Sequence, residues 1–237
     1  IRMEKKYKFL IAFFSLVTIV SLAGFYSSYW SKFPRLGEFK NLIHIHFLAF
    51  TCWLFLIIIQ PILIMRKKFN LHRQLGTFSY LLAPILVLTI ILLTKEKFIR
   101  EFAESESSAA MTAFIAFVDI SSFSTFYLIA MFKKSNVRWH VAFIIAATLI
   151  VLNPGLSRIL NQISPGSGLL TAVLIPFLIP GIVLIIEKIK YKRAILKSPY
   201  FLIITIWTIE ILLFIIIPPT DFWKNTTYNL GIFLTKN

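Results

Sequence analysis

The residues of this 237-residue chain that could do chemistry are the few ionisable side chains inside its long apolar runs. Two of them are acids, Asp119 and Glu210, and each lies near the middle of an otherwise uncharged run. If such a run crosses a bilayer, a charge at its centre costs about 2.5–3.5 kcal/mol, and an acid at that depth is functional by default. We therefore expect the two carboxyl groups to handle protons or a cation. The simpler interpretation is a neutral acid, buried and hydrogen-bonded to neighbours such as Ser121, Ser122 and Ser124.

A second group of polar residues is predicted at one end of the apolar runs. His44 and His46 begin one run, and Arg158 ends another. Because positions i and i+2 of a helix are about 200° apart, the two histidines cannot both face one ligand unless the helix start is unwound. The predicted outward-facing pocket contains His44, His46, Asn153 and Arg158, with Asp119 and Glu210 at its floor. It would bind or conduct a small polar or anionic ligand; the alternative is that Arg158 extends to the interface and the histidines are ordinary interfacial residues.

The other two histidines suggest a different function. His72 and His140 are predicted at equal depth, at the starts of two other runs. Two axial histidines at one depth on different helices could hold a b-type haem, so the alternative is a membrane redox or haem-binding protein. A metal ion needs three or four converging ligands, whereas His44-x-His46 supplies two at most. The sequence therefore predicts no metal site.

Composition determines the class of protein. Hydrophobic residues make up 58% of the chain and charged residues only 15%, against about 45–50% and about 25% in soluble domains. Disorder is excluded because it requires low hydrophobicity, and a disulfide scaffold is excluded because Cys52 is the only cysteine. The net charge of +15 does not indicate nucleic acid, because a basic binding surface needs a soluble body to carry it. The class that fits this composition is an integral membrane protein, and we expect membrane lipids to be among its partners.

Seven runs are long enough to span a bilayer, which takes roughly 20 apolar residues per helix. Lysines precede the first run as in a signal peptide, but the run is longer than an apolar signal segment of about 7–15 residues, so we expect a retained helix. The predicted fold is all-α, a polytopic transmembrane bundle over residues 1–217, followed by an outer interfacial tail at 218–237. A short interfacial helix is expected within 95–108. The seven helices are predicted near residues 9–30, 42–65, 74–94, 109–132, 139–161, 168–188 and 200–217.

The basic residues predict the orientation of these helices. When the connections are assigned to alternate sides, 16 of the 25 Lys and Arg residues fall on the side of the N-terminus and nine on the other. Cytoplasmic loops carry the excess of Lys and Arg in membrane proteins. We therefore expect a cytoplasmic N-terminus and an outer C-terminus.

Two stretches together resemble a known family. The first contains Gln60, the junction Leu71-His72-Arg73 and Gly76, and the second runs from His140 to Arg158. This combination resembles a family of uncharacterised bacterial predicted membrane proteins, over about residues 40–160. The resemblance implies a multi-pass protein of the bacterial inner membrane but no activity. Its histidines are loosely similar to those of di-haem membrane cytochromes, although the histidines here do not stack as two transmembrane pairs.

A third function remains open beside ligand binding and haem binding. Small residues let helices approach closely in a membrane, and a group of alanines begins the fourth predicted helix. The chain could then be a non-catalytic subunit whose helices pack against partners in a larger membrane complex. The alanines are Ala109, Ala110, Ala113 and Ala116.

Overall fold

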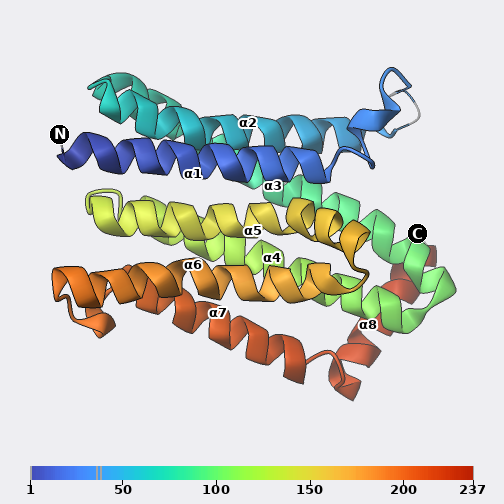
Figure 1. Ribbon diagram of the computed structural model, residues 1–237. Coiled ribbons are helices and arrows are strands. Elements are labelled where there is room, and N and C mark those ends of the chain that lie inside the picture. Colours follow the sequence, from blue (N-terminus) through green and yellow to red (C-terminus); the bar gives the residue numbers. More distant parts are fainter. Residues whose placement is uncertain (1, 36, 38, 237) are drawn as a thin grey trace. The chain divides into compact units, whose positions relative to one another are not determined.

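The structure is a computed structural model that describes residues 2–35, 37 and 39–236, with side chains from Tyr7 onward, and this part of the chain is all-helical (Figure 1). Seven of its eight α-helices, α1–α7, are long and apolar enough to cross a membrane, which confirms the predicted fold class at this level. The α-helices are α1 (Arg2–Gly24), α2 (Asn41–Met65), α3 (Phe69–Glu104), α4 (Glu106–Phe132), α5 (Val137–Ile163), α6 (Ser167–Tyr191), α7 (Pro199–Ile216) and α8 (Asp221–Lys236). Two short 3₁₀ helices are η1 (Trp30–Lys32) and η3 (Ile195–Lys197).

Specific residues set where the helices begin and end. Ser105 caps α4, because its hydroxyl accepts a hydrogen bond from the Ser108 amide at 3.3 Å. Ser198 caps α7 in the same way, and Pro199 follows at the first helical position, where its missing N–H costs nothing. The end of α2 is closed by Lys67, whose φ of 58° lets the next amide, that of Lys68, return to a carbonyl of the last turn.

Two segments differ from the expected pattern. The α3 helix continues to Glu104, so the expected separate interfacial helix within 95–108 is instead the end of α3 and the start of α4. No Gly or Pro interrupts residues 95–104, and Lys97 forms an ion pair with Glu101 one turn later, which favours continuation of the helix. The predicted tail at 218–237 contains a regular helix, α8, after the break at Pro218-Pro219.

The chain divides into two compact units, and the division passes through three helices. Unit 1 contains residues 1–89 and 151–172, which include α1, α2, most of α3 and the end of α5. Unit 2 contains residues 90–150 and 173–237, which include α4, α7, α8 and most of α6. Each unit is described below by itself.

In unit 1, α1 lies along α2 (Figure 1) and meets the end of α5 at a contact between small residues. A Cβ atom added to Gly155 would lie 2.7 Å from the Ser21 carbonyl oxygen, and one added to Gly24 would collide with the Gly155 backbone. Ser21 is fully buried. The two backbones therefore touch, which is the close approach that small residues permit between apolar helices.

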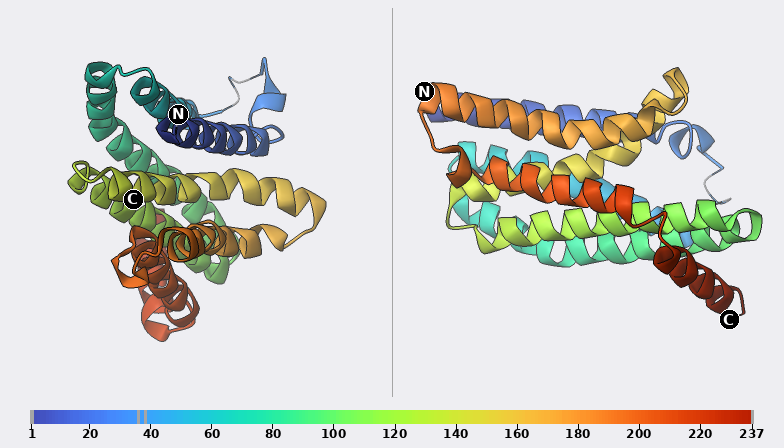
Figure 2. Two further views of the ribbon diagram at one scale, coloured as in Figure 1. Left: turned by 60° about the vertical axis from the view of Figure 1, so that its left-hand side comes forward. Right: turned by 90° about the horizontal axis from the view of Figure 1, so that it is seen from below.

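In unit 2, α4 packs against both α7 and α8, and α8 continues at an angle to α7 (Figure 2). Trp223 of α8 donates its indole N–H to the Ala110 carbonyl at 3.0 Å and packs edge-on against Phe114. Trp207 of α7 makes a similar bond to the Val173 carbonyl of α6. The small residues at the start of α4 therefore support a contact within the chain, since Ala110 is buried under α8.

We predict that Gly155→Ala destabilises the protein by about 1–3 kcal/mol, because the new methyl group meets the α1 backbone and cannot be accommodated without moving a helix. Gly181→Ala is the matched control, since a Cβ there has nothing within 4 Å and alanine has the higher helix propensity. Chemical denaturation of the purified variants in detergent micelles measures both changes. A Gly155→Ala variant as stable as the wild type would contradict the contact.

Candidate functional site

Aromatic rings gather in unit 1 where α1 ends and α2 begins. Phe25 and Tyr29 are one turn apart, and the Tyr29 amide donates to the Phe25 carbonyl at 2.9 Å. Tyr29 stacks on Phe47 with ring centroids 4.2 Å apart, and Phe25 lies 5.4 Å from Phe50. Such ring pairs contribute about 0.5–1.5 kcal/mol beyond their buried area. We call these rings the α1–α2 aromatic cluster; its members are Phe25, Tyr29, Trp30, Phe39, Phe47 and Phe50.

His44 and His46 both contact this cluster, but from different sides of α2. The Nδ1 atom of His44 is hydrogen-bonded to the Tyr29 hydroxyl at 2.7 Å. The Nδ1 atom of His46 is 2.8 Å from the Thr89 hydroxyl on α3, and its ring stacks on Phe50. The helix is regular from Asn41 onward, so the prediction that the two side chains diverge is confirmed.

The bond between His46 and Thr89 has a definite direction. The Thr89 hydroxyl lies 2.8 Å from the Ile85 carbonyl, which can only accept, so its single proton is directed to its own helix. Nδ1 of His46 is then the donor to Thr89, and the remaining ring nitrogen, Nε2, carries the lone pair. The α3 helix therefore sets the tautomer of a histidine on α2.

Arg158 contacts the same cluster from α5. Its guanidinium carbon lies 4.3 Å from the centre of the Phe25 ring, in a cation–π arrangement. Its Nη1 donates to the Pro154 carbonyl at 2.8 Å, one turn back along its own helix. The residue is exposed, and a guanidinium has five N–H donors, of which the structure shows one in a hydrogen bond within the described part of the chain.

Asn153, which was predicted beside Arg158, occupies a different environment. It is buried, with 5% of its surface exposed, and its Oδ1 atom has no hydrogen-bond partner among the described residues. Within the same part of the chain it makes no hydrogen bond with Arg158 or with either histidine.

The two acids lie together in unit 2. The Ser122 hydroxyl of α4 is hydrogen-bonded to Oε2 of Glu210 on α7 at 2.6 Å and lies 2.8 Å from the Val118 carbonyl of its own helix. Asp119, one turn earlier on α4, is close enough to Glu210 for an electrostatic interaction. The sequence predicted Ser122 as a hydrogen-bond partner of a buried acid. The acid that it bonds to is Glu210, which is 88 positions away in the sequence.

The predicted binding residues therefore fall into two groups. His44, His46 and Arg158 meet on the α1–α2 aromatic cluster in unit 1, and Asn153 belongs to the same unit. Asp119 and Glu210 lie on two neighbouring helices of unit 2, α4 and α7. The pocket that joins all six residues remains a prediction.

The histidines of the haem hypothesis also belong to different units. His72 is in unit 1, where its backbone carbonyl accepts a hydrogen bond from the Gln60 amide at 3.2 Å. His140 is in unit 2, where its Nδ1 donates to the Ala130 carbonyl at 2.9 Å. A backbone carbonyl on one ring nitrogen is the usual orientation of a ligating histidine, with Nε2 left for the ligand. Haem as a cofactor remains a prediction.

Glu187, near the end of α6, was not predicted as a key residue from the sequence, but its side chain has several charged and polar partners. Its carboxylate accepts bonds from Nε of Arg138 at 2.8 Å, Nη1 of Arg193 at 2.9 Å and the Ser198 hydroxyl at 2.6 Å, with a further bond from Arg138. The side chain is only 8% exposed. The sequence feature that could have indicated this network is a single acid, Glu187, followed by five cationic residues before Ser198-Pro199. We call these four residues the Glu187 network.

We predict that Glu187→Gln destabilises the protein by about 3 kcal/mol, the lower end of the cost of breaking a buried ion pair, because the two arginines are 31% and 46% exposed. The matched control is Lys97→Gln, which breaks an exposed pair with Glu101 and should cost about 0.5 kcal/mol or less. Denaturation in detergent micelles compares the two variants. Equal losses would show that Glu187 is no more important than a surface acid.

Possible metal ligands and similarity to other proteins both bear on the function of these residues. Among the side chains that the structure describes, no three His, Cys, Asp or Glu residues lie close enough to hold a metal ion. Comparison of the chain with protein-family models, with curated proteins and with solved structures gives no match. The geometry of the two units is therefore the basis for the function proposed below.

Proposed function

We propose that the chain is a multi-pass integral membrane protein that binds or conducts a small polar or anionic ligand through the α1–α2 aromatic cluster. The seven long apolar helices support insertion in a membrane. The excess of Lys and Arg on one side supports a cytoplasmic N-terminus and an outer C-terminus, so the cluster faces outward. The bacterial inner membrane is the location that the family resemblance implies.

The observation that carries this proposal is that three ionisable side chains reach one set of rings. His44 bonds to Tyr29, His46 stacks on Phe50, and Arg158 lies over Phe25. The rings position the side chains, and the exposed guanidinium supplies donors that match two oxygens of an anion. Because α1, α2 and α5 each contribute, the arrangement depends on the folded unit and not on a local motif.

The chemistry of the cluster indicates the ligand class. A guanidinium over a ring is attracted to the π face and still presents N–H groups at its edge. The neighbouring tyrosine hydroxyl and the histidine rings can both donate and accept. An oxyanion with an attached apolar or planar group would therefore be bound at both its ends, while a purely apolar molecule would leave the guanidinium unpaired.

The carboxyl pair in unit 2 supplies the second part of the proposal, which is proton handling. Glu210 is held by Ser122, and Asp119 interacts with Glu210. A protonated carboxyl group donates and an ionised one accepts, so a pair with a hydroxyl beside it has hydrogen-bond partners in both states. We propose that this pair takes up and releases a proton when the ligand moves.

We predict that benzenesulfonate, an anion with a planar apolar ring, raises the melting temperature of the purified protein and that Arg158→Gln weakens its binding about tenfold to hundredfold. The reason is that a hydrogen bond to a charged group is worth about 1.5–3 kcal/mol. Arg100→Gln is the matched control, because Arg100 is also predicted on the outer side of the membrane but belongs to unit 2. This variant should bind the anion as the wild type does. A thermal-shift titration measures both, with inorganic phosphate as a second probe. If neither anion shifts the wild-type melting temperature, the ligand-binding proposal is wrong.

We predict that an inward gradient of benzenesulfonate acidifies the lumen of proteoliposomes that contain the protein, and that Asp119→Asn or Glu210→Gln slows this acidification about a hundredfold, as expected when a proton-transfer group is removed. A pH-sensitive dye in the lumen follows the change. Asp221→Asn, at the start of α8, is the control and should keep the wild-type rate. Wild-type rates in both acid variants would exclude the pair from proton handling, and a constant lumen pH in the wild type would exclude conduction.

A further inference from the structure

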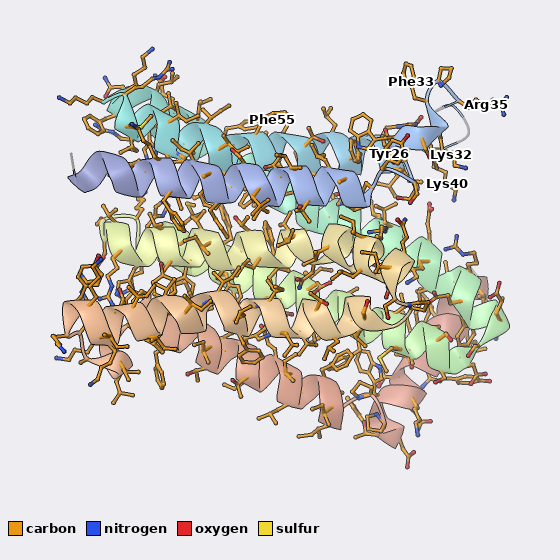
Figure 3. The ribbon with its side chains drawn as sticks, viewed as in Figure 1. Tyr26, Lys32, Phe33, Arg35, Lys40 and Phe55 are labelled. Carbon is orange, nitrogen blue, oxygen red and sulfur yellow. The ribbon has the colours of Figure 1, made fainter. Side chains whose placement is uncertain are left out.

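The connection between α1 and α2 exposes aromatic and cationic side chains together. Phe33 is 73% exposed, Tyr26 is 66% exposed and Trp30 is 41% exposed. The cationic side chains Lys32, Arg35 and Lys40 are exposed as well. Figure 3 shows Phe33 and Arg35 at the far end of this connection, with Tyr26, Lys32 and Lys40 closer to the helices. We call these six residues the aromatic–cationic surface.

These aromatic rings are exposed although the segment that carries them is held firmly. Tyr29, between the exposed Tyr26 and Trp30, is buried and stacked on Phe47. The Ser27 hydroxyl accepts a hydrogen bond from Gln162 of α5 at 2.9 Å. One face of the segment is therefore fixed on unit 1, and the other presents its rings outward.

The surroundings of these rings determine what can cover them. Three cations lie around them, while the one acid of the connection, Glu38, is outside the described residues. Tyr and Trp are favoured at the boundary between hydrocarbon and headgroups, and Lys and Arg form charge-assisted hydrogen bonds with phosphate groups. The α2–α3 turn also exposes three cations, Arg66–Lys68, but it has no Tyr or Trp beside them. Of these two connections, the one between α1 and α2 carries both exposed aromatic rings of Tyr and Trp and exposed cations.

We propose that the aromatic–cationic surface binds the phosphate of an anionic phospholipid, with Lys32, Arg35 and Lys40 on the headgroup and the rings of Tyr26, Trp30 and Phe33 in the boundary layer. This inference rests on the insertion in a membrane proposed above. It goes beyond that proposal, because it assigns a lipid to a surface that the His and Arg residues of the ligand site do not form.

The test uses Trp30 as a local reporter in the full chain. The protein is reconstituted in vesicles of brominated phosphatidylglycerol or brominated phosphatidylcholine, and the difference in quenching between the wild type and Trp30→Phe isolates the signal of Trp30. We expect quenching by phosphatidylglycerol to exceed that by phosphatidylcholine about threefold, below the roughly fivefold enrichment that one cation near an anionic surface supports. The triple variant Lys32→Gln, Arg35→Gln, Lys40→Gln should reduce the ratio to about one.

Two controls make the outcome decisive. The triple variant Arg66→Gln, Lys67→Gln, Lys68→Gln removes the same charge from the other end of α2 and should keep the preference at Trp30. Phe55→Trp places a reporter on an exposed position of α2 away from the loop (Figure 3), and it should be quenched equally by both lipids.

The possible results separate the two proposals. Equal quenching of Trp30 by both lipids, or loss of its preference in the control triple variant, overturns the lipid site. Loss of the preference on addition of inorganic phosphate would also overturn it, since the surface would then bind free phosphate. An unquenched reporter at position 55 in both lipids would overturn membrane insertion itself.

Discussion

The constraint on which this structure depends is that polar groups within long apolar helices have to find their partners inside the chain. The threonine hydroxyls show the simplest solution, since Thr148 and Thr205 each donate to the carbonyl one turn back in their own helix. The histidine and acid side chains cannot be satisfied in this way. Some of them reach a group on another helix, as His46 of α2 does with Thr89 of α3 and Glu210 of α7 with Ser122 of α4.

The polar contacts form two networks of different character. The Glu187 network uses every oxygen of its carboxylate on groups of the same chain, which suits a structural role. The α1–α2 aromatic cluster differs, because Arg158 contacts a ring and a backbone carbonyl but keeps donors exposed. A fully satisfied network stabilises, whereas a partly satisfied cation on a rigid surface can bind something else. This difference is why we place the ligand at the cluster and not at Glu187.

The same segment serves both proposals through its two faces. The inward face of residues 25–30 carries Phe25 and Tyr29, which position Arg158 and His44. The outward face carries Tyr26 and Trp30, which are exposed. Trp30 belongs to both sets of contacts, since it lies edge-on to Phe47 and is 41% exposed, so the proposed ligand contacts and lipid contacts share one short stretch of chain.

Local sequence determined much of this protein. The seven apolar helices follow from hydropathy and length, and the divergence of His44 and His46 follows from helical periodicity. The end of α3 was misplaced because charged residues favour a helix as well as a surface turn, and only the cap at Ser105 marks the boundary.

The partners of the polar residues were decided by the tertiary structure alone. His46 is bonded to a threonine 43 positions away, Glu210 to a serine 88 positions away and Glu187 to an arginine 49 positions away. Periodicity places a residue on a face of its helix, but it carries no information on which helix packs against that face. Helix packing depends on complementary shape between distant segments, such as the contact of Gly24 with Gly155, and that complementarity exists only in the folded chain.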